Sequence, residues 1–326
     1  MKKFLKKTSL FLVTAAMTVS APLMAWALEH DIVILHTNDI HCGINDNIGF
    51  AGLAQIKKDA LARTPNVALV DAGDAIQGAP IGKLSRGLAV VDIMNYLGYD
   101  FCIHGNHEFD YGKERFLELV PLQRAGYYCA NFVYAGNNKQ VLPGYKIMQY
   151  EDTKVAFVGA STPESLTTST PTFFQNEKGK YIYSFCEDKT GNKLYKQLQK
   201  NIDKARKDGA DYVFIVGHLG MDGTTPQWSS ESVAKNTQGV DAVIDGHSHE
   251  RFTRMVKNKV GKDVLLAQTG TKLKTVGELV ISPGGKLKSR LITESNGKDA
   301  NIARVIAQEI KTYEPLLKQP VGEALL

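Results

Sequence analysis

Short apolar segments alternate with amphipathic segments along most of the chain. The apolar segments, rich in β-branched residues, predict strands at residues 31–35, 66–70, 101–104, 155–159, 212–216 and 241–244. Helical periodicity predicts helices near residues 52–63, 84–97, 113–124 and 194–207. Strands that are apolar along their whole length and alternate with helices are typical of buried sheets with helices packed on their faces. The pattern therefore predicts a layered α/β fold.

The last third of the chain has a different pattern. From Phe252 onward, apolar and polar residues alternate with period two, and turn sequences such as residues 282–285 (SPGG) separate the segments. This predicts a short antiparallel section. A final helical pattern covers residues 299–317, and Pro320 ends it.

The first 27 residues have the features of a signal peptide. Residues 1–7 (MKKFLKK) are basic, an apolar run follows, and residues 25–27 (AWA) form a small-x-small cleavage pattern. An uncleaved membrane anchor is the alternative, but Pro22 interrupts the run. We therefore predict cleavage near Leu28 and an exported protein, periplasmic or secreted, with no stable membrane anchor.

The composition is that of an ordinary globular protein. Hydrophobic residues make up 43% and charged residues 22% of the 326 residues, which excludes a disordered or fibrous chain. The formal charge of +5 includes four lysines in residues 1–7, so the rest has 35 basic against 34 acidic residues. Such a balance predicts no binding to a nucleic-acid polymer.

The four cysteines are too few for a disulfide scaffold. They are Cys42, Cys102, Cys129 and Cys186, and no C-x-x-C spacing occurs. Any pairing among them stays open, and Cys102 and Cys129 lie in apolar runs that predict buried free thiols.

Residues of the types that bind metals follow five of the predicted strands. They are Asp39 and His41; Asp71 and Asp74; Asn106 and His107; His218; and His247 and His249. In an open α/β sheet the carboxyl ends of the strands border one crevice, so these groups are expected to converge. Each group alone is a weak signal, since Asp74 could cap a helix and His218 could pack in a core. Five of the eight histidines fall in these segments, however, and that concentration favours a shared site. His30 is left outside the site, and His36 and His104 are expected to pack or cap strand ends.

These segments resemble a known family. The motifs are LHTNDIH at 35–41, DAGDAIQG at 71–78, GNHEFDYG at 105–112, GHLG at 217–220 and DGHSH at 245–249. They resemble the calcineurin-like metallophosphoesterases, most closely the bacterial 5′-nucleotidase and 2′,3′-cyclic phosphodiesterase family, which includes periplasmic UDP-sugar hydrolases. The resemblance implies a sandwich of mixed β-sheets flanked by helices. It further implies a catalytic domain at residues 28–318, with residues 319–326 starting a linker to a C-terminal nucleotidase domain absent from this chain.

The resemblance also assigns roles to individual residues. It implies a first metal held by Asp39, His41, Asp74 and His249, a second held by Asp74, Asn106, His218 and His247, and a catalytic pair formed by His107 and Asp110. Family members carry either Gln or His at the position of His249. Mixed imidazole, carboxylate and amide ligands suit divalent Zn, Mn, Co or Fe. Two such ions can clamp a phosphate and generate a hydroxide that attacks phosphorus.

The predicted function is hydrolysis of nucleotides or other small phosphate esters, chiefly as a 5′-nucleotidase. A 2′,3′-cyclic-nucleotide 2′-phosphodiesterase with 3′-nucleotidase activity and a UDP-sugar hydrolase are alternatives within the same class. An inactive surface binding module is an alternative of a different class. It would be expected to lack a ligand or His107, and all of these residues are present.

Overall fold

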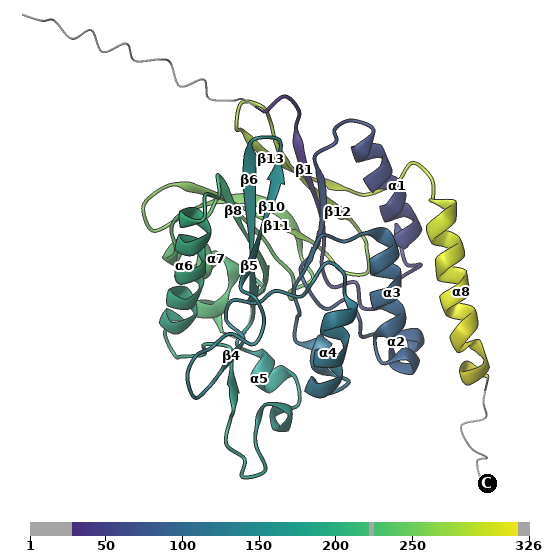
Figure 1. The fold of residues 1–326 in the computed structure, drawn as a ribbon, viewed down its shortest axis with the longest axis horizontal. Coiled ribbons are helices and arrows are strands. Elements are labelled where there is room, and N and C mark those ends of the chain that lie inside the picture. The colour runs from purple at the N-terminus through teal and green to yellow at the C-terminus, as the bar shows by residue number, and fades with distance from the viewer. Residues whose placement is uncertain (1–27, 222–224, 319–326) are drawn as a thin grey trace, which may run out of the picture.

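Two β-sheets lie face to face in the computed structural model, which describes residues 28–221 and 225–318 (Figure 1). The predicted signal peptide (1–27) and the predicted linker (319–326) lie outside the described residues. The first sheet has the strand order β13-β12-β1-β2-β3. Its strands are β1 (Ile32–Thr37), β2 (Val67–Asp71), β3 (Phe101–Cys102), β12 (Val276–Ile281) and β13 (Leu287–Ile292).

The second sheet has the strand order β10-β11-β9-β8-β6-β5. Its strands are β5 (Tyr145–Tyr150), β6 (Thr153–Ser161), β8 (Tyr212–His218), β9 (Ala242–Ile244), β10 (Arg251–Lys257) and β11 (Asp263–Thr269). Both sheets are mixed: β1-β2-β3 and β6-β8-β9-β11 pair in parallel, whereas the outer pairs are antiparallel. A short ribbon of β4 (Val133–Tyr134) and β7 (Tyr183–Ser184) stands apart.

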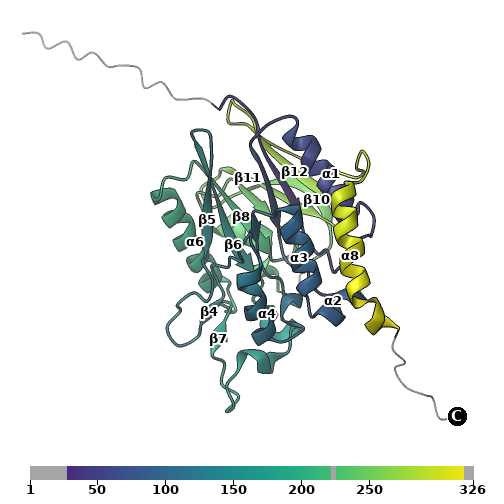
Figure 2. The same ribbon diagram turned by 45° about the vertical axis from the view of Figure 1, so that its right-hand side comes forward.

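Helices cover the outer face of each sheet. Figures 1 and 2 show α1, α3 and α8 on the side of the first sheet and α6 on the side of the second. The helices are α1 (Gly49–Leu61), α2 (Pro80–Ser85), α3 (Leu88–Leu97), α4 (Lys113–Leu119), α5 (Ser165–Thr168), α6 (Asn192–Lys207), α7 (Ser230–Asn236) and α8 (Ala300–Leu317). The layers are therefore helix, sheet, sheet and helix, which confirms the predicted sandwich.

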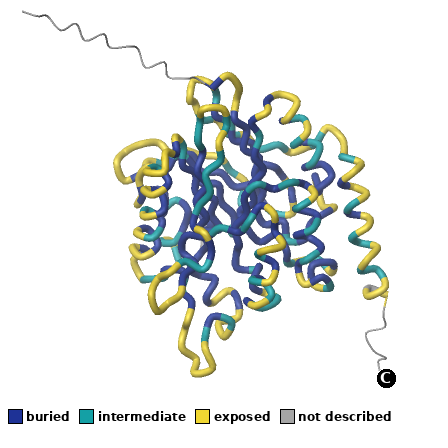
Figure 3. Tube along the Cα trace, in the orientation of Figure 1, coloured by how far each residue is buried: buried dark blue, intermediate teal, exposed yellow. Residues whose placement is uncertain are grey.

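The apolar strands explain this layering. In β1, Ile32 and Ile34 point into the core between the sheets, while Val33 and Leu35 pack against the helices. Successive side chains of a strand face opposite sides, so a strand buried on both faces is apolar throughout. Figure 3 shows the result, with buried strands inside and exposed residues on the outer helices and loops.

Two helix predictions were too long. The segment predicted as one helix at 84–97 is divided into α2 and α3 because Arg86 and Gly87 have positive φ values of 47° and 86°. The segment predicted at 113–124 forms α4 and then a 3₁₀ turn at 120–122, because Pro121 has no N–H group to continue the helical hydrogen bonds. Strands β4, β5 and β7 were not predicted.

The antiparallel section after Phe252 is confirmed, but it is divided between the sheets. The hairpin β10–β11 extends the second sheet, whereas β12–β13 joins the first sheet beside β1. The segment between them, residues 270–275, passes from one sheet to the other close to the carboxyl end of β1.

The remaining sequence predictions about buried residues hold. All four cysteines are free and buried. His36 and His104 are fully buried, and burial lowers the pKa of His36 to about 3 and that of His104 to about 4. Among the described helices, none combines the length and apolar character needed to cross a membrane.

Candidate metal centre

The predicted ligands lie together where strands of both sheets end. Asp39 and His41 follow β1, Asp74 follows β2, Asn106 follows β3, His218 ends β8, and His247 and His249 follow β9. The expected convergence at the carboxyl ends of the strands is therefore found, although it involves two facing sheets rather than one open sheet.

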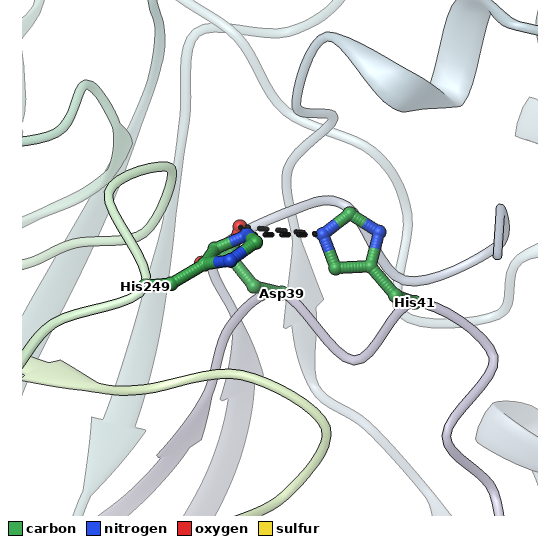
Figure 4. Close-up of side chains that lie close together, drawn as sticks. All are labelled: Asp39, His41 and His249. Atoms are coloured by element: carbon green, nitrogen blue, oxygen red, sulfur yellow. Dashed lines mark hydrogen bonds and ion pairs between the residues drawn. The ribbon is translucent and has the colours of Figure 1, made fainter.

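One group of ligands consists of Asp39, His41 and His249 (Figure 4). Their nearest ligand atoms lie within 4.8 Å of one another. His249 Nε2 is 3.2 Å and His41 Nε2 is 3.8 Å from Asp39 Oδ1, and the two Nε2 atoms are 3.1 Å apart. Three ligand atoms thus converge on one small volume, where they could hold a divalent cation.

A second group consists of Asp74, His218 and His247, whose ligand atoms also lie within 4.8 Å of one another. His218 Nε2 is 3.0 Å from Asp74 Oδ2 and 4.0 Å from Asp39 Oδ1, so the two groups are neighbours. His41 Nε2 lies 3.9 Å from Asp74 Oδ2, which places Asp74 between the groups.

An oxygen without a donor and a buried pair of charged groups both suit bound cations. The side-chain oxygen of Asn106 is buried and accepts no hydrogen bond from the described residues. Burial disfavours charge on Asp74 and His218, but their ion pair outweighs it, raising the pKa of His218 to about 10 and lowering that of Asp74. A buried carboxylate and an oxygen without a donor are both satisfied by a cation, and a metal would replace the proton of His218.

The backbone at these positions is strained. Asp39, His41, Asp74, His247 and His249 all have positive φ, between 47° and 81°. Such conformations are costly for residues with a Cβ and persist where the surroundings hold them.

Two glycines allow the loops to approach one another. A Cβ added at Gly105 would lie 2.2 Å from Asp74 Oδ1, and one at Gly246 would lie 2.9 Å from His218 Nδ1. Glycine at both positions therefore keeps the space beside the ligands open.

A buried carboxylate that the sequence analysis did not assign joins two of the ligand loops. Glu108 Oε2 accepts hydrogen bonds from the backbone N–H groups of Asp74 (2.8 Å) and Gly105 (2.6 Å). Its Oε1 accepts from those of Ala75 (2.8 Å) and Ile76 (3.3 Å). Burial and the charge of Asp74 raise the pKa of Glu108 to about 7. Glu108 therefore connects the loop after β2 to the loop after β3.

Asn38 and Glu164 hold other ligands. Asn38 donates to Asp39 Oδ2 (2.6 Å) and to the carbonyl of Gly270 (2.7 Å), so it fixes the Asp39 carboxylate against the segment that leaves β11. Glu164 Oε2 lies 3.3 Å from His247 Nε2. A carboxylate on the ring nitrogen opposite the metal orients a histidine ligand and fixes its tautomer.

His107 lies at the open side of the site. Its Nδ1 is 2.7 Å from Asp110 Oδ2, and its ring centroid is 5.4 Å from that of His41. The Asp110 hydrogen bond outweighs burial and raises the pKa of His107 to about 9. The His107 side chain is 37% exposed, whereas that of His218 is fully buried. His107 can therefore meet a bound solute and present a proton to it.

The structure thus brings together the residues that the sequence analysis singled out, except Asp71, whose carboxylate bonds Thr37 and the backbone of Gly73. Asn38 and Glu108 lie inside the quoted motifs, which was the available signal for them. Glu164 lies outside those motifs.

Comparison with known proteins agrees with this geometry. The calcineurin-like phosphoesterase family matches residues 32–251. The chain is 29% identical over 359 residues to the snake venom 5′-nucleotidase of Gloydius brevicauda, covering 97% of this chain and 57% of the relative. It is 26% identical over 272 residues to the 2′,3′-cyclic-nucleotide 2′-phosphodiesterase/3′-nucleotidase of Haemophilus influenzae, covering 73% and 40% respectively.

Among solved structures, the 5′-nucleotidase precursor of Thermus thermophilus superposes with a TM-score of 0.74 at 23% identity, covering 90% of this chain and 61% of that one. This likeness shows the fold. The chain spans between about two fifths and three fifths of the length of these relatives.

Proposed function

The chain belongs to the calcineurin-like phosphoesterase family, and from this membership we propose that it hydrolyses nucleotides with the help of two divalent metal ions, chiefly as a 5′-nucleotidase. One observation carries the proposal: two groups of ligand atoms lie side by side at the ends of both sheets, next to the partly exposed His107.

The proposed ligands follow from the two groups. Asp39, His41 and His249, with Asp74 between the groups, would hold the first ion. Asp74, Asn106, His218 and His247 would hold the second. Two bound ions would supply positive charge to phosphoryl oxygens and lower the pKa of a bound water. Zn, Mn, Co and Fe suit this donor set.

His107 and Asp110 have the arrangement of a proton donor and its positioning partner. The hydrogen bond to Asp110 fixes the His107 ring and leaves Nε2 available for the leaving-group oxygen. Because His107 belongs to neither ligand group, its loss is expected to impair hydrolysis without emptying the metal sites.

The relatives support a nucleotide as substrate. They are named as 5′-nucleotidases and as a 2′,3′-cyclic-nucleotide 2′-phosphodiesterase/3′-nucleotidase. The second name gives a second candidate activity. A suitable set of substrates also distinguishes both activities from UDP-sugar hydrolysis and from binding without catalysis.

One purified preparation separates these functions. We would measure metal content and then phosphate release from AMP, 3′-AMP, 2′,3′-cyclic AMP and UDP-glucose in the presence of Mn²⁺. A 5′-nucleotidase is expected to contain two ions per chain and to act best on AMP. Asp74→Ala, which removes the carboxylate between the groups, should abolish metal binding and hydrolysis together. A metal-loaded wild-type protein that hydrolyses none of the four substrates would contradict the proposal.

Export is part of the proposal and rests on the predicted signal peptide at residues 1–27. N-terminal sequencing of the protein from its native host would test it. Cleavage after Ala27 is expected, and an intact Met1 on the mature protein would contradict export through this signal.

A further inference from the structure

The buried side-chain amide of Gln268 forms hydrogen bonds with the loop that carries His247 and His249. Gln268 lies in β11 opposite Phe252 of β10, and its side chain has no exposed surface. Its Oε1 accepts a hydrogen bond from the backbone N–H of Glu250 (2.6 Å), and its Nε2 donates to the carbonyl of Gly246 (2.9 Å). The amide therefore bonds both ends of the five-residue segment 246–250.

The middle of the segment contacts the same amide. The Ser248 hydroxyl lies 3.1 Å from Gln268 Nε2 and 3.2 Å from its Oε1, and it accepts from the backbone N–H of Met221 (3.2 Å). Residues 246, 248 and 250 thus contact Gln268, and the two residues between them are the histidines of the metal groups. The segment is bent rather than extended, since His247 and His249 have positive φ and the Ser248 N–H donates to the Gly246 carbonyl (3.1 Å).

We propose that Gln268 is a positioning residue for both metal ions, a role that rests on the proposed function. His249 belongs to the first ligand group and His247 to the second, and both have positive φ (57° and 81°). A strained segment keeps its geometry only where surrounding contacts hold it. The Gln268 amide supplies such contacts at both ends of the segment, so one side chain sets the position of one imidazole in each group.

The chemistry of the position requires an amide. Gly246 presents a carbonyl acceptor and Glu250 presents an N–H donor, and a carboxamide offers one group of each kind in one plane. Glutamate would place an oxygen against the Gly246 carbonyl and near the Asp245 carboxylate, which lies 3.4 Å from Nε2. Leucine would leave the Glu250 N–H without an acceptor and the Gly246 carbonyl with only the hydrogen bond from the Ser248 N–H (3.1 Å). Asparagine is one methylene too short to reach them.

Other contacts hold His247 alone, so they can be distinguished from the contacts of Gln268. The His247 backbone N–H donates to Asp39 Oδ2 (2.9 Å), and its ring lies near Glu164. These contacts involve one histidine, whereas loss of Gln268 should affect both ligand groups together.

The test compares Gln268→Leu with the wild type in the full chain. Co²⁺ titration followed by visible absorption would give the affinity of each site and the coordination geometry, and metal content after dialysis would give the stoichiometry. Changing a residue that orients metal ligands typically costs about 10–100-fold in metal affinity. We expect such a loss at both sites, an altered Co²⁺ spectrum, and recovery of kcat toward the wild-type value in excess Mn²⁺.

Asn258→Ala is the matched control. Asn258 is also a buried amide, and its Oδ1 accepts from the N–H groups of Val260 (3.0 Å) and Lys262 (2.9 Å) in the turn at the opposite end of β10 and β11. Its loss should lower the melting temperature and leave both metal affinities unchanged. Gln268→Asn, which keeps a polar side chain, carries the test if the Leu variant does not fold.

Three results would overturn the positioning role: metal affinities of the Gln268 variants within threefold of the wild type, a loss at one site only, or an equal loss in Asn258→Ala. The proposed function survives all three, provided that the wild type binds two ions. A wild-type protein that binds no divalent ion would overturn the function as well.

Discussion

Replacing Glu108 by glutamine should loosen the site by removing half of the acceptors that join two ligand loops. The Glu108 carboxylate accepts four backbone N–H groups, two on each oxygen. Glutamine retains one oxygen, and its NH₂ group would face two donors. It is expected to keep the shorter pair, from Asp74 and Gly105, and to leave the N–H groups of Ala75 and Ile76 without an acceptor.

The size of the effect follows from burial. A buried donor without a partner costs about 1–3 kcal/mol, and the 3.3 Å contact to Ile76 is the weakest of the four. Two donors without a partner would lower the free energy of unfolding by about 2–4 kcal/mol. At pH 8 the variant also loses a buried charge that the raised pKa marks as unfavourable, so we expect a net loss of about 1–3 kcal/mol for Glu108→Gln. Urea unfolding at pH 8, above the pKa of about 7 that burial gives Glu108, would measure it in chelator and again with Mn²⁺.

The control replaces an exposed carboxylate nearby. The Glu114 side chain on α4 is 74% exposed, so Glu114→Gln should change the stability by less than about 0.5 kcal/mol. A loss below about 1 kcal/mol in Glu108→Gln would refute the reasoning, because the four hydrogen bonds would then contribute little to holding the loops.

Four further outcomes are expected. Removing metal with a chelator should abolish phosphate-ester hydrolysis, and adding Mn²⁺, Co²⁺ or Zn²⁺ should restore it; unchanged hydrolysis after verified metal loss would refute the two-metal proposal. His107→Asn should reduce kcat by about 10²–10⁴-fold with two ions still bound, and an emptied metal site would show that its role is misassigned. Asn106→Ala should weaken one ion more than the other in a Co²⁺ titration, because it removes a single ligand oxygen, and equal affinities before and after would contradict that assignment. Burial raises the pKa of Glu278, but hydrogen bonds from Arg290 and Arg63 outweigh it and hold the pKa below the ordinary 4.5. Glu278→Gln should therefore lower stability at pH 7, by an amount that shrinks as the pH falls through the pKa of the folded state. A stability difference that is the same at pH 7 and pH 3.5 would contradict the ion-pair contribution.

Much of the fold was predictable from the sequence because its information is local. An apolar run such as residues 212–216 must be buried on both faces, and the amphipathic pattern of α6 must cover a sheet. The ligand types were also readable, since each motif follows an apolar strand and the strand ends of a layered α/β fold meet. Metal-binding residue types after five strands therefore indicated a site before any tertiary contact was known.

Tertiary structure decided what depends on contacts between distant segments. The same period-two pattern predicts β10–β11 and β12–β13, yet one hairpin extends the second sheet and the other joins the first beside β1. His41 and His249 are 208 positions apart and lie in one ligand group, while His247, two positions from His249, lies in the other. Local pattern determines which residues are buried and which element they form, whereas the partner of a buried polar group is set by the chain that packs against it. For this reason the roles of Glu108 and Gln268, which bond backbone groups of other loops, could be assigned only once those loops were in place, although Glu108 lies inside a quoted motif.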